Sequence, residues 1–422
     1  MSDIHVTRYD NCPRLTDLNE SETICRLFGI TEDDADEGDI AIIDRDTATG
    51  GDLVLLHYLK NNPKTNHVHG TIVDISNPDN ITVVAHNFPY PQDVSGCVTF
   101  TEDPDGLGTY VTKMIEGTTI RIYIHPRTNQ VTLSTAKRIN GFNGKWNDLE
   151  FGKTFLETCG VDNLEYFRKF LVTNDGRHTE DVADSVCLFF VLRHPLNRIV
   201  CRCDEPSVTF IGIFDENMSF SCPDRFIFNN DEANDITDDG KNNIKIMKDI
   251  FGVPVCSAED INKAASELKW EESPGLLILN LSDHGRIVVC QRLAAPGYDE
   301  KRALRGNEPN LRMRYLDLYF RHSFGELNEF EKLFSDRQNE WAVAQNNIEG
   351  MMLWLKHCFK TRYIYEKYLR LPACAHYVIS RAEKIYLPGV KTIRGCIAEI
   401  MSTSNAQQLN SILKCYLQSR VD

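Results

Sequence analysis

The amino-acid sequence predicts an α+β protein in which a β-rich region precedes an all-helical one. Between residues 67 and 320, short runs of β-branched and aromatic residues are separated by Asn, Asp, Gly and Pro, as in strands joined by turns. From Ser323 onward, apolar residues instead recur three and four positions apart, which predicts helices. Hydrophobic residues make up 42% and charged residues 25% of the 422 positions, a balance typical of a globular protein with a large core.

Composition and pattern together predict three domains. Residues 1–64 form an acidic segment that we expect to pack on the core, since its first 60 positions carry fourteen acidic and five basic residues. Residues 65–322 hold most of the expected strands, and residues 323–422 form the helical domain. At roughly 100–200 residues per domain, the length suits two or three domains.

The β-rich region contains runs that we expect to pair in mixed or antiparallel sheets. The expected strands lie at residues 70–75, 81–88, 119–125, 130–139, 187–192, 198–203, 208–214, 275–281 and 286–293. Helical stretches interrupt them near residues 163–171 and 261–270.

The helical domain is predicted to contain five or six helices. Ser323 and Glu326 have the spacing of a capping box ahead of an apolar stripe, so we expect the first helix to start there. Further apolar stripes run through residues 351–359, 363–369 and 393–400. Thr403 or Ser404 is expected to cap the last helix.

The charge of the chain is unevenly distributed. Its 46 basic and 61 acidic residues give a formal net charge of −15, which by itself speaks against nucleic acid as a partner. Residues 351–422, however, carry eleven basic and four acidic residues. We therefore expect any RNA contacts to be confined to the helical domain and to arginines around a pocket, with an affinity that falls steeply with salt.

The sequence favours a cytoplasmic protein that does not enter a membrane. No apolar run approaches the roughly 20 residues of a membrane helix, and the first residues contain no signal-peptide core. The fourteen cysteines are scattered, which favours reduced and buried thiols. Cys201 with Cys203, and His67 with His69, are pairs two residues apart, but neither has further ligands at metal-site spacing.

Residues 110–139 hold the residue types that covalent nucleotidyl transfer needs. Lys113, Glu116 and Gly117 lie between two β-runs, and Lys137 and Arg138 follow in the next one. In this chemistry a neutral lysine amine attacks the α-phosphate of a nucleoside triphosphate, and nearby cations stabilise the developing charge. A glycine lets the nucleotide approach the backbone. The alternative reading is that Lys113 is a solvated charge at a strand edge.

Further stretches follow in a characteristic order. They are HGTIVDISNPDNITVVAHNF (69–88), KMIEGTTIRIY (113–123), LSTAKRINGFNGKW (133–146), FFVLRHPLNRIVCRCDEP (189–206), PGLLIL (274–279) and RGNEPNLRMRYL (305–316). This set resembles the ATP-dependent RNA ligases of the T-even phage type, and more closely the RNA ligases predicted for large DNA viruses. The resemblance covers roughly residues 65–320, and a helical extension follows it as in the phage ligase.

The resemblance implies a nucleotidyltransferase fold, with ATP held between two antiparallel sheets and Mg²⁺ or Mn²⁺ assisting. It also implies an RNA ligase that joins 5′-phosphate and 3′-hydroxyl ends through a lysyl-AMP intermediate, with Lys113 as the nucleophile. In this resemblance, the nucleotide pocket would be shaped by Glu116, Gly117 and Thr118, and the phosphates would be contacted by Arg121, Lys137 and Arg138. Arg198 would hold the ribose side. The residues that lie where the family closes over the triphosphate would be Arg305, Glu308 and Arg314.

The position of the lysine departs from the family's motif. The family places its lysine three residues before the glycine, where this chain has Met114, whereas Lys113 is four residues before Gly117. A shift of one residue along a strand turns a side chain to the opposite face. Lys113 therefore serves only if a bulge redirects it, and Lys137 is the reserve nucleophile.

Other expected groups are also replaced. Val191 stands where the phage-type ligase has a glutamate, Pro274 and Gly275 replace Glu-Gly, and Gln291 and Arg292 replace a Lys-x-Lys pair. Loss of two carboxylates weakens a metal site unless other acids such as Glu205 or Glu308 substitute. Two alternatives to the ligase therefore stay open: a catalytically degenerate RNA-binding protein, and a guanylyl-transferring capping enzyme that uses GTP.

Overall fold

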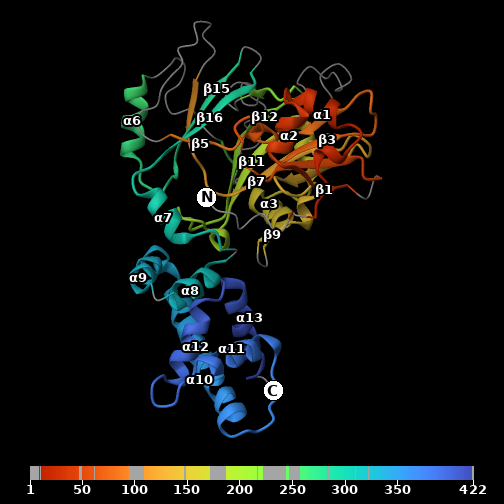
Figure 1. The fold of residues 1–422 in the computed structure, drawn as a ribbon. Coiled ribbons are helices and arrows are strands. Elements are labelled where there is room, and N and C mark those ends of the chain that lie inside the picture. The colour runs from red at the N-terminus through yellow and green to blue at the C-terminus, as the bar shows by residue number, and fades with distance from the viewer. Residues whose placement is uncertain are drawn as a thin grey trace. The chain divides into compact units, whose positions relative to one another are not determined.

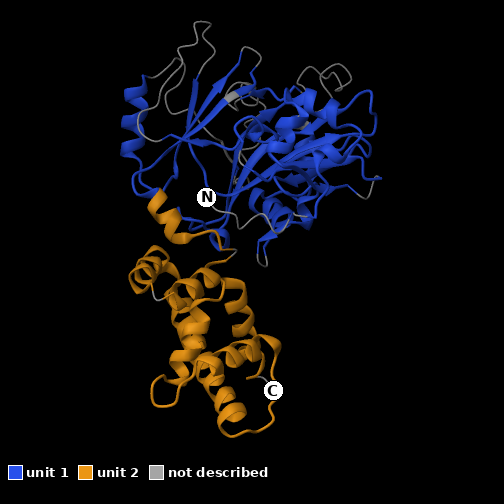
Figure 2. Ribbon diagram, viewed as in Figure 1, with its two compact units in different colours: residues 1–298 blue, residues 299–422 orange. Residues whose placement is uncertain are grey.

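The structure, a computed structural model, divides into two compact units, residues 1–298 and residues 299–422 (Figure 2). It describes residues 9, 11–46, 50–60, 62–94, 109–146, 149–171, 187–215, 217–221, 244–246, 257–282, 285–308, 310–321 and 323–420. The predicted boundary after residue 322 lies inside the second unit, because α8 (Leu311–Phe320) belongs with the later helices. The division into three domains stays a prediction.

The first sheet is antiparallel and is built near the N-terminus. Its strands are β1 (Ile40–Arg45), β2 (Leu53–Tyr58), β3 (Thr71–Asp74) and β4 (Thr82–Ala85), in that order (Figure 1). Two helices, α1 (Ser21–Phe28) and α2 (Glu32–Glu37), pack with it, and Phe28 shares an apolar cluster with Val54 and Leu56. The acidic segment thus contributes β1 and β2 to a sheet, because apolar runs interrupt its charged stretches.

The largest sheet has six strands. Its order is β13 (Phe220–Ser221), β12 (Ser207–Phe214), β11 (Cys187–Arg193), β7 (Thr118–Ile124) and β8 (Val131–Thr135), and β14 (Ile244–Ile246) pairs with β12. The pairings are antiparallel except that of β12 with β14. One face packs against α3 (Phe151–Cys159), a 3₁₀-helix (Leu164–Phe167) and α4 (Arg168–Leu171). A short ribbon of β9 (Lys145–Trp146) and β10 (Leu149–Glu150) precedes α3.

A further sheet has four strands. Their order is β5 (Gln92–Asp93), β16 (Ile287–Ala294), β15 (Gly275–Leu281) and β6 (Thr109–Lys113). The helix α6 (Ala258–Glu267) covers one face, where Ile261 packs with Val111, Leu276 and Ile278. The neighbours of these residues along each strand face the other way, because side chains alternate along a strand.

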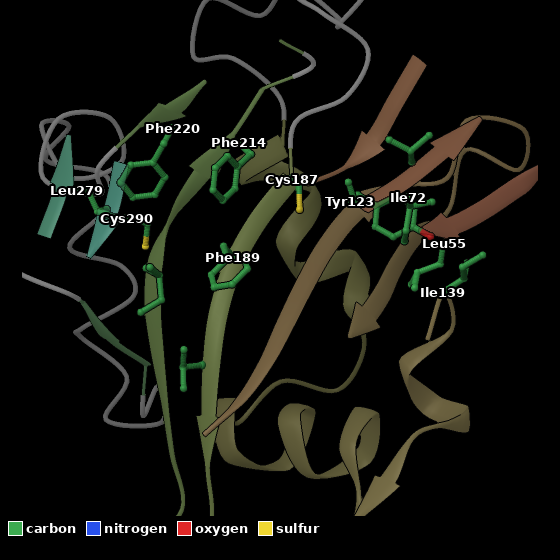
Figure 3. Packing of buried hydrophobic residues seen from close by; sticks show 14 of the residues in the cluster. Leu55, Ile72, Tyr123, Ile139, Cys187, Phe189, Phe214, Phe220, Leu279 and Cys290 are labelled. Carbon is green, nitrogen blue, oxygen red and sulfur yellow. The ribbon is translucent and has the colours of Figure 1, made fainter. Parts of the chain in front are cut away.

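One apolar cluster joins the three larger sheets (Figure 3). The Phe88 ring centre lies 4.8 Å from that of Phe189, 5.1 Å from that of Phe214 and 5.0 Å from that of Phe220. Leu279 of the four-stranded sheet belongs to the same cluster, as do residues of β2 and β3. Burial of each such side chain stabilises the fold by about 1.5–3 kcal/mol, so this cluster is the main reason that the sheets form one unit.

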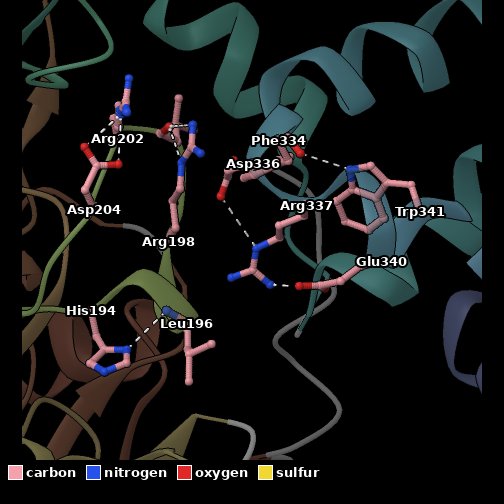
Figure 4. A network of polar contacts seen from close by, with 11 residues as sticks. His194, Leu196, Arg198, Arg202, Asp204, Phe334, Asp336, Arg337, Glu340 and Trp341 are labelled. Atoms are coloured by element: carbon pink, nitrogen blue, oxygen red, sulfur yellow. Dashed lines mark hydrogen bonds and ion pairs between the residues drawn. The ribbon is translucent and has the colours of Figure 1, made fainter. Parts of the chain in front are cut away.

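Regular structure in the described part of the second unit is helical. The helices are α7 (Tyr298–Arg305), which begins at the boundary, then α8, α9 (Phe324–Leu333), α10 (Gln338–Phe359), α11 (Ala373–Ile385), α12 (Ile393–Ser402) and α13 (Ala406–Gln418). Tyr315 stacks on Trp341 with ring centres 5.3 Å apart, and the Trp341 Nε1–H donates to the Phe334 carbonyl at 3.0 Å (Figure 4). Among the helices described, none is long and apolar enough to cross a membrane.

The predicted fold class is confirmed: the protein is α+β, with antiparallel sheets followed by helices. Several local predictions are wrong. Residues 198–203 form no strand, the Ser323 side chain makes no capping hydrogen bond, and residues 363–369 do not continue a helix beyond a π-helical turn at Lys360–Ile364. The cap of the last helix is Asn405, whose side chain accepts the Gln408 N–H, and not Thr403 or Ser404.

Candidate functional site

Lys113, the predicted nucleophile, is the last residue of β6. The pairing of β6 with β15 is regular here: Lys113 lies opposite Leu276, and Val111 lies opposite Ile278. Val111, Leu276 and Ile278 all pack with α6. Residues two apart on a strand share a face, so the exposed Lys113 lies on the α6 face of this sheet. The described pairs of β6 contain no bulge that would redirect it.

Met114 continues the strand on the other face. Its N–H donates to the Gly275 carbonyl at 2.8 Å, which extends the ladder one residue beyond β6. Alternation then places Met114 on the same face as Tyr110 and Thr112, opposite α6. Tyr110 belongs to the apolar cluster that joins the sheets. The half-buried Met114 therefore occupies the place that the ligase motif gives to its lysine.

Glu116 anchors the segment that follows β11. Its Oε2 accepts hydrogen bonds from the Val200 and Cys201 N–H groups at 3.0 and 2.7 Å, and its Oε1 accepts one from the Tyr298 hydroxyl at 2.5 Å. These bonds explain why residues 198–203 form no strand, since N–H groups in the middle of the segment donate to a carboxylate and not to a neighbouring strand. Burial and then the nearby Glu116 carboxylate raise the pKa of the Cys201 thiol.

Gly117 and Thr118 bring two of the matching motifs together. A Cβ at Gly117 would collide with the Leu192 carbonyl oxygen and the Val191 side chain, so glycine is required there by close packing. The Thr118 Oγ1 accepts a hydrogen bond at 3.0 Å from the side-chain amide of Asn197. Asn197 belongs to the HPLNRIV motif, so the EGTT and HPLNRIV motifs lie side by side.

Val191 is the residue that the sequence analysis predicts in place of a glutamate. It is 7% exposed and lies in the apolar cluster, against which Ile115 and Leu277 also pack. Across the described residues, no group of three or more His, Cys, Asp and Glu side chains is arranged to hold a metal ion. Glu205, a proposed substitute, is exposed to solvent. Within these described residues, a divalent metal would therefore be held by fewer than three such side chains, together with the phosphates of a substrate.

Two arginines lie beside the partners of Glu116. Arg198 donates from Nε and Nη2 to the Val200 carbonyl, at 3.3 and 3.2 Å (Figure 4). The buried Arg292 pairs with Asp93 at 2.6 Å, and its guanidinium carbon lies 5.8 Å from the centre of the Tyr298 ring. Arg292, which the sequence analysis predicts in place of a lysine pair, thus lies beside the tyrosine that binds Glu116.

Arg121 is fully buried and binds the backbone. Its Nη1 donates to the Gly70 carbonyl, and its Nη2 donates to the Thr135 carbonyl at 2.6 Å. Burial lowers the pKa of its guanidinium. Arg121 thus ties the residue before β3 to the end of β8, and the predicted contact with a phosphate would require these hydrogen bonds to open.

Lys137 and Arg138 follow β8 and lie beside the first sheet. Arg138 pairs with Asp44 of β1 at 3.4 Å. Lys137 lies near His69, whose pKa is lowered well below its usual value by burial first and then by nearby charges that include Lys137. The Arg138 side chain thus contacts the first sheet, whereas the Thr118 side chain contacts the HPLNRIV motif. The predicted phosphate-binding residues therefore belong to two different sets of contacts.

Arg305, Glu308 and Arg314 lie in the second unit and form a local group at α7 and α8. The buried Arg305 donates from Nη1 to the Gly306 and Glu308 carbonyls, at 3.1 and 3.0 Å. Arg314 pairs with Asp317 at 2.8 Å. Burial and then the charge of Asp317 raise the pKa of the Glu308 carboxyl. The role of these residues toward a triphosphate stays a prediction.

Two side chains that are not predicted from the sequence form hydrogen bonds with the EGTT motif, those of Asn197 and Tyr298. Asn197 lies within the HPLNRIV motif, so its polar amide is a signal that the sequence offers. Tyr298 carries no local signal, because its partner Glu116 is 182 residues away along the chain.

Comparison with known proteins gives structural neighbours only. No protein-family model matches the chain, and no curated protein matches its sequence. Two forms of an archaeal ATP-dependent RNA ligase are similar in structure: the first has a TM-score of 0.39 and 12% identity over 78% of each chain. The second has a TM-score of 0.38 and 10% identity over 77% of this chain and 76% of the ligase. A Naegleria gruberi RNA ligase mutant with ATP and Mn has a TM-score of 0.29 and 14% identity over 47% of this chain and 53% of the ligase.

Proposed function

We propose that this chain is an RNA ligase-like nucleotidyltransferase in architecture, that it binds RNA, and that it forms no lysyl-AMP through Lys113. The register of β6 carries this proposal: Met114 takes the face that the motif reserves for the lysine, and Lys113 lies on the α6 face. The ordered motifs support the ligase-like architecture, because EGTT and HPLNRIV, far apart in the sequence, are in contact.

A methionine cannot replace a lysine in this reaction. The lysine amine attacks the α-phosphorus of ATP, loses a proton and displaces pyrophosphate, which leaves a phosphoramidate whose nitrogen carries no charge. A thioether sulfur has no proton to lose and would keep a positive charge. The buried Val191 adds to the argument, since it offers no oxygen ligand where the family has a carboxylate.

Charge supports RNA as the partner. Residues 351–422 carry eleven basic and four acidic residues, although the whole chain has a net charge of −15. Clustered lysines and arginines bind phosphates and release counterions. An RNA with 5′-phosphate and 3′-hydroxyl ends is the substrate class that the motif resemblance implies, and binding of such ends does not require the missing nucleophile.

A labelling experiment tests the proposal. The full chain is incubated with α-³²P-labelled ATP and Mg²⁺ or Mn²⁺, and the same preparation is titrated with labelled RNA in a filter-binding assay. We expect RNA retention without a protein label that survives denaturation in SDS. An SDS-resistant label on the wild type that disappears in Lys113→Ala would overturn the proposal. Labelled GTP is run in parallel, and label from GTP alone would favour the capping enzyme.

A second candidate function is an active ATP-dependent RNA ligase in which Lys137 is the nucleophile. The position of Lys137 favours it, because this lysine follows β8 in the LSTAKRI motif and lies near the buried His69. The same assay separates this candidate from the first. It requires an SDS-resistant protein adenylate that persists in Lys113→Ala and is lost in Lys137→Ala.

A further inference from the structure

The segment after α10 begins with hydrogen-bonded turns, and several of its side chains project into solvent. α10 ends in the π-helical turn Lys360–Ile364, a feature that is rare and often found at functional sites. The Tyr365 N–H donates to the Lys360 carbonyl and the Lys367 N–H to the Thr361 carbonyl, both at 2.9 Å. Between them Glu366 adopts a left-handed conformation, with φ of 50°, which is strained for a residue other than glycine.

This segment presents large apolar rings to water. Tyr368 is 92% exposed and Tyr365 is 58% exposed, and Ile364 beside them is 48% exposed. The base of the turn is anchored, because Tyr363 packs on the buried Phe359 with ring centres 5.3 Å apart. Exposed apolar side chains that lie close together are typical of an interaction surface.

Basic residues outnumber acidic ones in the stretch of sequence that carries these rings. Residues 360–384 contain six basic residues and two acidic ones. Lys367 and Arg370 are exposed next to Tyr368, and on α11 the Arg381 guanidinium lies 4.5 Å from the centre of the Tyr377 ring. Such a mixture of stacking surfaces and cations matches the bases and phosphates of a nucleic acid strand.

We propose that residues 360–384, here called the tyrosine segment, bind single-stranded RNA. The rings of Tyr365 and Tyr368 stack on unpaired bases, and Lys367 and Arg370 pair with the phosphates that flank them. The inference rests on the RNA binding of the proposed function and deepens it, since it names the surface and the form of RNA that is bound.

The rings favour a single strand over a duplex. In an A-form duplex the bases are already stacked on one another, and the deep, narrow major groove excludes side chains. A ring that protrudes into solvent gains a stacking partner only where bases are unpaired. The excess of cations argues against an ordinary apolar protein partner and leaves an acidic protein segment as the competing occupant.

Fluorescence anisotropy of the full chain tests the proposal. The probes are a fluorescein-labelled 12-nucleotide oligouridylate, a duplex RNA of the same length and an oligoglutamate peptide. We expect the wild type to prefer the single strand. Tyr365→Ala with Tyr368→Ala weakens single-strand binding about tenfold to hundredfold, and Tyr368→Trp retains it. Replacement of Lys367 and Arg370 by Gln lowers the slope of log affinity against log salt by about 1.4.

The control variant is Val343→Ala with Leu353→Ala, which removes exposed apolar side chains of α10 outside the tyrosine segment. Wild-type affinity in this control and unchanged melting in all variants support the proposal. Full RNA binding by the double tyrosine variant, a preference for the duplex, or tighter binding of the peptide overturns it while leaving RNA binding by the chain intact. If the wild type binds no RNA at all, the proposed function fails as well.

Discussion

One carboxylate, that of Glu116, joins three stretches of the first unit: the start of β7, the segment at Val200 and Cys201, and Tyr298. Hydrogen bonds to an ionised acceptor are stronger than those between neutral groups. A buried donor that loses its acceptor costs more than the bond itself is worth. The structure therefore gives Glu116 a positioning role in the fold, whether or not a nucleotide is bound.

Glu116→Gln is expected to lower the free energy of unfolding of the first unit by about 1–3 kcal/mol. The amide keeps one acceptor oxygen but turns a donor group toward partners that are themselves donors. Urea denaturation at pH 7 measures the change. The matched control is Glu205→Gln, which alters an exposed carboxylate in the adjoining segment and should change stability by less than about 0.5 kcal/mol. Equal effects of both substitutions would contradict the role assigned to Glu116.

The sequence predicts which site residues lie together when they belong to recognisable motifs. It does not predict the direction or the partner of a side chain that is set by backbone far away along the chain. The EGTT and HPLNRIV motifs are recognisable from their residues alone, and they do lie side by side. The direction of Lys113 is set by the pairing of β6 with β15, whose residues lie more than 150 positions further on. Arg121 has the appearance of a phosphate ligand in the sequence, yet it donates to carbonyls of Gly70 and Thr135.

At the scale of elements, apolar runs in the sequence predict most of the strands. Contacts between residues far apart in the sequence explain the predicted elements that do not form. Runs such as those of β7, β11, β12 and β15 match their predictions because each is buried in a sheet. The run at 198–203 has the same composition, but Glu116 takes two of its N–H groups. The helical pattern at 363–369 likewise fails, because its apolar side chains face solvent and gain nothing from a helical stripe.

The contact between α11 and α13 contains a pair of thiols that oxidation can join. The Sγ atoms of Cys374 and Cys415 lie 2.9 Å apart, and both residues are half-buried. We expect glutathione disulfide to accept two electrons and two protons from the pair, which leaves one intramolecular disulfide and two glutathione molecules. A cross-link that closes a long loop typically stabilises a fold by about 2–4 kcal/mol, so the melting temperature of the second unit should rise.

Mass spectrometry of a non-reducing digest, with and without glutathione disulfide, measures the cross-link directly. Cys415→Ser is the control, and it should abolish both the linked peptide and the rise in melting temperature. A linked peptide that pairs Cys374 with another cysteine, or the absence of any linkage after prolonged oxidation, would contradict the expected pairing.

At the scale of the whole molecule, net charge and local charge point in opposite directions. The value of −15 describes no single surface, because the first 60 residues are strongly acidic and residues 351–422 are basic. The compact units divide the chain in the same sense, since the acidic strands lie in the first unit and the basic helices in the second. The net charge of the whole chain is therefore a poor guide to its partners, and the charge of each unit is the better one.

Stability of the first unit should fall when the pH is lowered through the range of histidine. His86 is 5% exposed, packs edge-on against Phe214 with ring centres 5.1 Å apart, and exchanges a hydrogen bond with the Thr71 hydroxyl. Burial first, and then the charges of His67, Arg121 and Arg286, lower the pKa of His86 from 6.5 to about 3. Below pH 6.5 the unfolded chain takes up a proton at this position and the folded chain does not.

The free energy of unfolding is therefore expected to decrease by about 2 kcal/mol on account of His86 when the pH falls from 7.5 to 5. The carboxyl of Asp34, whose pKa is lowered to about 2, titrates below this window and does not oppose the change. Urea denaturation of the wild type and of His86→Gln at the two pH values measures the effect, which should shrink by about that amount in the variant. His376→Gln, at an exposed position of α11, should keep the full dependence. An identical pH dependence in all three proteins would show that His86 is not buried as a neutral group.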